Sequence, residues 1–152
     1  MKKITLIPLI GLFLLPLTTF ADVSIVGKWR NIDDQTGFSK GIIEIYKEQD
    51  GTYAGKIYEI NARPGYIPQE YCYKCSGEKR NKPIVGMTVI WNFVNTPEKP
   101  LHFDKGTILD PSSGKVYRGK LRLSENGKRL NLKGFIGIEM LGRNQTWLRV
   151  DN

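Results

Sequence analysis

Short stretches in which apolar and polar residues alternate run along most of the chain. The clearest two are KVYRGKLRL (115–123) and RLNLKGFIG (129–137), separated by SENGK. Such alternation has a period of two and predicts β-strands with one face in a core. The opposite face of these two strands is basic and consists of Arg118, Lys120, Arg122, Arg129 and Lys133.

Turn signals connect these stretches into hairpins. Asn126-Gly127 joins the two strands above, because both residues tolerate the positive φ angles of tight hairpin turns. Asp110-Pro111 predicts a turn before residue 115, and Asp50-Gly51 predicts one between 41–47 and 52–60. The chain is therefore expected to form antiparallel neighbours in sequence order.

Three further stretches have the same character: VGKWRN (26–31), MTVIWNFV (87–94) and QTWLRV (145–150). Together they give about eight strands, a number typical of an antiparallel sandwich or a closed barrel. Gly55, Gly119 and Gly134 lie inside strands, where a strongly curved sheet needs small side chains. We therefore predict an all-β, up-and-down antiparallel barrel with no helix after the last strand.

Two aromatic motifs, GKW at 27–29 and WLR at 147–149, occupy the first and last predicted strands. In lipocalin-like barrels a Gly-x-Trp of the first strand lies under a basic residue from the last strand. Gly27, Trp29, Trp147 and Arg149 are accordingly expected to close the base of the barrel. The alternative is that both tryptophans are ordinary core residues and Arg149 faces solvent.

The first 21 residues have the features of a secretory signal peptide. Lys2 and Lys3 precede an apolar run, and Thr19 and Ala21 supply small residues for cleavage after Ala21. Pro8 and Pro16 interrupt the run, which is too short for a spanning helix. The prediction is a single domain, residues 22–152, that is periplasmic or secreted and does not span a membrane.

The net charge of the whole chain is +8, and loss of Lys2 and Lys3 would leave +6. For an exported protein this charge favours contact with anionic lipid, lipopolysaccharide or glycan surfaces over nucleic acid. Solvation of a polar outer face explains the same charge.

Motifs spread over the chain carry a family resemblance: GKWRNIDDQTG, GKIYEI, CYKC, KPIVG, GTILDPSSGKVY and GFIGIEMLGRNQTWLRV. This ordered set resembles the exported bacterial family called domain of unknown function 2147. The resemblance implies a small exported domain with a calycin-type, lipocalin-like barrel. It supplies no activity and no catalytic residues.

Cys72 and Cys75 are the only cysteines, so their spacing could mark half a metal site, a redox pair or a disulfide. A structural zinc site takes four Cys or His ligands, and His102 is the only histidine. A redox pair normally starts a helix, whereas these residues lie between predicted strands. In an oxidising compartment we expect a Cys72–Cys75 disulfide and no metal.

Little else suggests catalysis. Asp33, Asp34 and Asp110 lie in turn-like segments, where aspartate is common. No Gly-rich phosphate loop or dinucleotide motif is present, so no cofactor is expected. A hydrolytic or thiol-redox enzyme is the weakest of three hypotheses.

The connection from residue 61 to 83 is much longer than a hairpin requires, and it contains RPGYIPQEYCYKC. Long loops on rigid barrels often carry binding residues. The leading hypothesis is a binding module that takes a small apolar or amphipathic molecule, with Tyr66, Tyr71 and Tyr73 contributing. The alternative is an envelope protein that meets anionic surfaces through its basic face.

Overall fold

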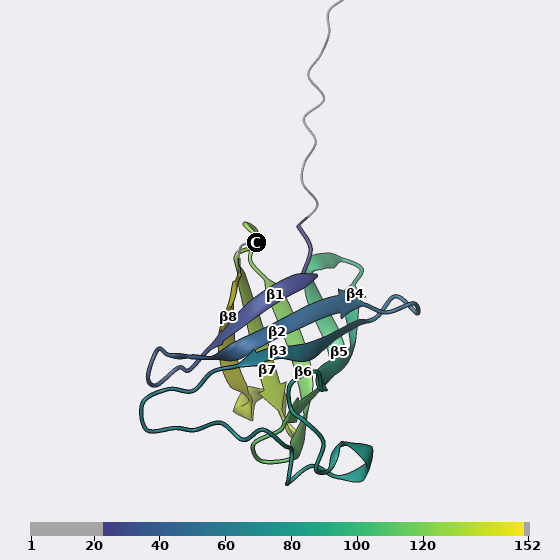
Figure 1. The fold of residues 1–152 in the computed structure, drawn as a ribbon. Coiled ribbons are helices and arrows are strands. Elements are labelled where there is room, and N and C mark those ends of the chain that lie inside the picture. Colours follow the sequence, from purple (N-terminus) through teal and green to yellow (C-terminus); the bar gives the residue numbers. More distant parts are fainter. Residues whose placement is uncertain (1–22, 151–152) are drawn as a thin grey trace, which may run out of the picture.

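The computed structural model describes residues 23–150, which form a closed barrel of eight antiparallel strands (Figure 1). Each strand pairs with the next, and β8 returns to pair with β1. The strands are β1 (Gly27–Ile32), β2 (Ser39–Lys47), β3 (Tyr53–Ile60), β4 (Thr88–Thr96), β5 (Lys99–Asp110), β6 (Lys115–Leu123), β7 (Arg129–Phe135) and β8 (Arg143–Arg149). The predicted up-and-down barrel is confirmed.

Two short 3₁₀ helices, η1 (Gly77–Lys79) and η2 (Glu139–Leu141), interrupt the connections. Within residues 23–150 no helix follows β8, and none has the length and apolar character needed to cross a membrane. The signal peptide predicted at residues 1–21 lies outside the described residues.

The turn residues act as the sequence suggests. Gly127 has a φ of 68°, and the hairpin it serves sets Leu123 opposite Leu130. In the turn between β5 and β6, the Asp110 carboxylate accepts hydrogen bonds from the Ser112 backbone and the Ser113 hydroxyl. Such side-chain bonds replace backbone pairing where a strand ends.

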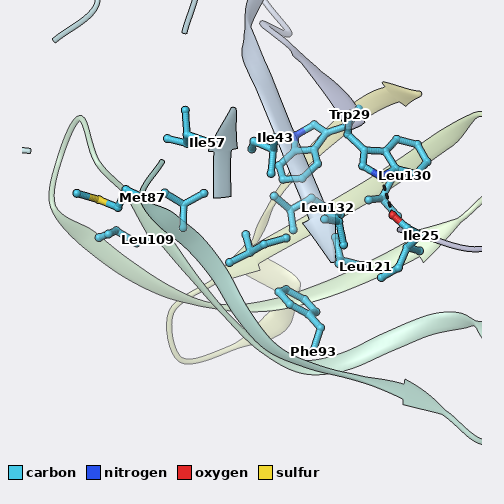
Figure 2. Close-up of a cluster of buried hydrophobic side chains, with 14 of the residues drawn as sticks. Ile25, Trp29, Ile43, Ile57, Met87, Phe93, Leu109, Leu121, Leu130 and Leu132 are labelled. Atoms are coloured by element: carbon cyan, nitrogen blue, oxygen red, sulfur yellow. Dashed lines mark hydrogen bonds between the residues drawn. The ribbon is translucent and has the colours of Figure 1, made fainter. Parts of the chain in front are cut away.

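One half of the barrel, here called the base, contains a packed apolar core. It lies at the end where β1 begins, and its fully buried side chains come from most of the strands (Figure 2). They are Ile25, Trp29, Ile45, Phe93, Leu121, Leu123, Leu130 and Trp147. Burial of these large side chains is the main source of stability in so small a domain.

Two inward-facing glycines make room for the Phe93 ring in this core. A Cβ on Gly106 would lie 2.2 Å from the ring, and one on Gly119 would lie 2.8 Å from it. Phe93 is completely buried and fills the space that the missing side chains leave. Side chains are therefore closely packed across the base of the barrel.

The other half, here called the mouth, is where the longer connections lie. Residues 33–38, 61–87, 111–114 and 136–142 all join strands at this end. The longest, residues 61–87, is named the mouth loop; it runs along the end opposite the start of β1 (Figure 1).

Candidate functional site

A cavity of about 510 Å³ lies inside the mouth half of the barrel. Its wall is largely apolar, with side chains from β2 to β5 and from β7 and β8: Ile43, Ile57, Ile60, Val89, Ile90, Ile108, Leu132 and Trp147. This size falls within the range of small-molecule sites, which are mostly apolar with a few placed polar groups.

Residues of the mouth loop complete the cavity. Arg63, Tyr66, Pro68, Gln69 and Ile84 belong to its lining. The long connection predicted from the sequence is thus part of the site, in addition to joining β3 to β4.

A small ribbon inside the mouth loop holds this connection in place. The backbone amide of Cys72 donates to Lys82, Asn81 donates back to Cys72, and Ile84 donates to Glu70. The predicted Cys72–Cys75 disulfide is confirmed and lies at the closed end of this ribbon.

The ribbon is also packed against the turn between β5 and β6. Cys72 Sγ lies 3.2 Å from the Pro111 carbonyl oxygen. A Cβ on Gly114 would lie 1.9 Å from the Lys74 carbonyl oxygen, so only glycine fits there. These contacts fix the mouth loop to the rim on the far side of the cavity from β1.

The three tyrosines of the binding hypothesis do not lie together. Tyr66 lines the cavity, and the Arg63 guanidinium stacks 3.9 Å from the centre of its ring. Tyr71 and Tyr73 contact one another with ring centres 6.2 Å apart, are exposed, and do not line the cavity. The structure therefore directs attention to Tyr66 alone among them.

Asp33, in the connection after β1, organises the charges on one side of the mouth. Its carboxylate accepts hydrogen bonds from the backbone amides of Gln35 and Thr36. Lys40 and Arg63, both in the cavity lining, lie 3.2 and 3.8 Å from it. The backbone hydrogen bond from Thr36, followed by that from Lys40, lowers the pKa of Asp33 to about 2.

Further polar groups line the cavity from β1, β6 and β8. Asn31, Tyr117, Arg143 and Gln145 belong to the lining. Asn31 Oδ1 and Gln69 Oε1 are buried and have no hydrogen-bond partner among residues 23–150. Buried polar atoms are normally paired, so these two oxygens are exceptions beside the cavity.

At the opposite end, the four residues expected to close the base lie together. The Arg149 guanidinium is stacked 4.2 Å from the centre of a Trp29 ring system, and Trp29 Nε1 donates to the Ile25 carbonyl. Arg149 also donates to the carbonyls of Gly127, Val26 and Ser24. A Cβ on Gly27 would lie 2.9 Å from the guanidinium, and Trp147 is buried beside this group in the same core.

The residues of the predicted basic face alternate with the buried positions of β6 and β7, and acidic residues lie beside two of them. Lys120 lies 2.8 Å from Glu139 and 3.9 Å from Asp104, and Lys133 lies 3.8 Å from Glu139. The Glu139 carboxylate raises the pKa of Lys120.

The three arginines of this face differ from its lysines. Arg118 lies 5.6 Å from the Phe135 ring centre, and neither it, Arg122 nor Arg129 forms an ion pair with a residue of the described part. No observation marks the basic face as a binding surface.

The single histidine lies away from the cavity. His102 on β5 is in register with Arg122 and does not line the cavity. Across residues 23–150 there is no group of three His, Cys, Asp or Glu side chains able to hold a metal ion.

Reasoning from sequence missed the polar residues of the cavity. Arg143 and Gln145 precede Trp147 and Arg149 by even steps along β8, so all four share the inward face. Extending the alternation backwards from WLR would have identified them. Asn31 could have been found in the same way, two residues after Trp29.

The model of a protein family described as uncharacterised protein conserved in bacteria (DUF2147) matches residues 27–149. The chain belongs to this family. The match covers all eight strands of the DUF2147 barrel, together with the mouth loop and the residues that line the cavity.

A solved structure has the same fold as this DUF2147 domain. It is protein HP1028 from Helicobacter pylori, which is described as belonging to the lipocalin family. The two share 15% sequence identity with a TM-score of 0.70, over 86% of this chain and 85% of that one. At this identity the likeness establishes a lipocalin-like fold and nothing further. A comparison with curated proteins found no match.

Proposed function

We propose that this DUF2147 domain binds a small amphipathic molecule in the cavity at its mouth. The main support for the proposal is that side chains fill the two halves of the barrel to different extents. Large side chains fill its base, whereas its mouth holds an open cavity of about 510 Å³ lined by isoleucines and by polar side chains. A chamber with both apolar and polar walls suits a ligand that has an apolar body and a polar end.

The mouth loop supports this proposal because it covers a hollow that the strands alone would leave open. It contacts the turn between β5 and β6 through Cys72 and Lys74, and these contacts are internal to the barrel. A preformed site loses less conformational entropy on binding than one that must be assembled.

We further propose that the protein works outside the cytoplasm. The disulfide supports this, since disulfides persist in oxidising compartments and are rare in the cytosol. The signal peptide expected at residues 1–21 points the same way.

The direct test is to purify the protein from its own envelope fraction and examine it by native mass spectrometry before and after organic extraction. We expect a mass increment that extraction removes. A protein with no bound molecule, which also fails to take up any amphipathic probe, would contradict the proposal.

A cavity-filling variant tests the location. Gly134 lines the cavity, and a Cβ there would have only ordinary contacts, the nearest at 3.5 Å from Ile108. Gly134→Phe should therefore occupy the chamber and weaken binding of N-phenylnaphthylamine at least tenfold, as measured by fluorescence titration. Val116→Phe, on the outer surface of the adjacent strand, adds the same ring and should leave binding unchanged. Equal binding by both variants would place the probe elsewhere.

A further inference from the structure

Arg143 is an exposed residue at the start of β8. It pairs with Gly134, and both residues line the cavity. Its side chain makes no hydrogen bond, ion pair or ring contact within residues 23–150. A guanidinium that remains charged at every relevant pH therefore borders the cavity without a partner there.

The other cations of the lining are already engaged. Lys40 and Arg63 both lie against the Asp33 carboxylate. Arg143 differs from these two residues, because no carboxylate in the described part of the chain forms an ion pair with it.

The two acidic residues of the lining are also engaged. Glu59 accepts a hydrogen bond from Asn61. Asp110 accepts hydrogen bonds from Ser112 and Ser113 within its own turn. Neither carboxylate lies within ion-pair distance of Arg143, so the charge at this point of the rim is positive.

We propose that the ligand is an amphipathic anion, and that Arg143 binds its carboxylate or phosphate head at the mouth. This inference rests on the proposed function, because it names the class of ligand for the same cavity. The apolar chain lies between the isoleucines, and the guanidinium offers the paired N–H groups that match such heads.

The unpaired amides support a ligand with a polar head. Asn31 Oδ1 and Gln69 Oε1 are buried at the same cavity without partners. A purely hydrocarbon ligand would exclude water from these atoms and leave them unsatisfied, which is unfavourable. A polar head, or a water molecule held beside it, satisfies them.

A set of probes that differ only in their head group tests this assignment. Decanoate, decyl phosphate, decanol and decylamine are titrated into the protein by calorimetry. We expect at least one of the two anions to bind about five- to tenfold more tightly than decanol, and decylamine to bind most weakly, because a charge-assisted hydrogen bond at a partly exposed site contributes at this level. The better anion identifies the head as carboxylate or phosphate.

Two variants assign the preference to one side chain. Arg143→Gln should remove the advantage of the anion and leave the affinity for decanol unchanged. Arg122→Gln removes a cation from the outer face and should alter neither affinity. Circular dichroism and the unfolding midpoint establish that both variants are folded.

The outcomes separate this inference from the proposed function. Equal binding of decanol and the anions by the wild type, or tightest binding of decylamine, would overturn the anionic head and leave the cavity as a binding site. A preference for anions that survives in Arg143→Gln would overturn the role of Arg143. Failure of all four probes to bind would contradict the proposed function itself.

Discussion

The base and the mouth of this barrel are built from the same eight strands and differ in what fills them. In the base, Trp29, Phe93 and Leu130 are completely buried and pack in one apolar core. In the mouth, the inward positions of the same strands carry isoleucines, polar side chains and Gly134, and a chamber remains. The choice of residue at inward positions, rather than the backbone, separates the densely packed part from the part that contains the cavity.

Strand β8 shows this change within one element. From its start to its end the inward positions are Arg143, Gln145, Trp147 and Arg149. The first two line the cavity, Trp147 lies at the boundary, and Arg149 stacks on Trp29 at the base. Arg149 has several described partners and Arg143 has none, although both lie on the inward face of β8.

The strongest test of the comparison is truncation of a large side chain in each half. Phe93→Ala in the base should lower the free energy of unfolding by about 4 kcal/mol, since a fully packed ring leaves an empty cavity. Ile108→Ala in the mouth should cost about 2 kcal/mol, because Ile108 already borders open space. Urea denaturation measures both. Equal losses would mean that the two halves are packed alike.

The same substitution, glycine to alanine, tests the comparison at one inward position in each half. Gly106→Ala should destabilise the barrel by about 2 kcal/mol, because its Cβ would meet the Phe93 ring at 2.2 Å. Gly134→Ala should be neutral or stabilise the barrel by about 0.5 kcal/mol. Alanine lowers the conformational entropy of the unfolded chain, and its Cβ would make only ordinary contacts in the folded protein. Thermal unfolding should show a lower midpoint for Gly106→Ala and an unchanged or higher midpoint for Gly134→Ala. The same sign for both would contradict the difference in filling.

Removal of the disulfide should affect the mouth selectively. The bridged residues are only three apart, so Cys72→Ala with Cys75→Ala should cost at most about 2 kcal/mol of global stability. Hydrogen exchange should accelerate in residues 70–84, whose backbone bonds the bridge supports, and stay unchanged in the strands of the base. Wild-type protein treated with a reductant is the matched comparison. Unchanged exchange in residues 70–84 would show that the ribbon does not depend on the bridge.

The smallest effect is expected from Asp33 at low pH. Its pKa in the folded protein, about 2, lies below the ordinary value of an unfolded chain, so its stabilising effect is complete above about pH 4. That effect is lost as the pH falls from 4 through 2. Asp33→Asn should therefore reduce the fall in urea midpoint between pH 5 and pH 2.5. Glu125→Gln, in the turn between β6 and β7, is the control and should show the same fall in urea midpoint as the wild type.

The base could be predicted from the sequence far better than the mouth. Alternation in 115–123 and 129–137, with Asn126-Gly127 between them, predicts the hairpin at its observed position. The motifs around Trp29 and Arg149 likewise lie within paired strands. These signals are local, since each depends on a few consecutive residues and the pleat of a strand.

The cavity could not be predicted, because it depends on distances between segments remote in sequence. Nothing local distinguishes Tyr66, which lines it, from Tyr71, which does not. The sequence predicts an end of the mouth loop near residue 83, but the loop extends to 87, where the Ile57 amide donates to the Met87 carbonyl and the Gly86 amide donates to the Ile57 carbonyl. The role of Gly106 could not be predicted, because the Phe93 ring that it accommodates lies on another strand.

Phe93 has one more consequence for the molecule. Its ring lies beside Ile108 in the space above Gly119, and Ile108 lines the chamber. A residue of smaller volume at this single position would leave a void beside Ile108 and Gly119. Phe93 itself does not line the chamber, whereas Ile90, Leu132 and Trp147 do, so the depth of the chamber depends on a layer of large side chains rather than on the course of the strands.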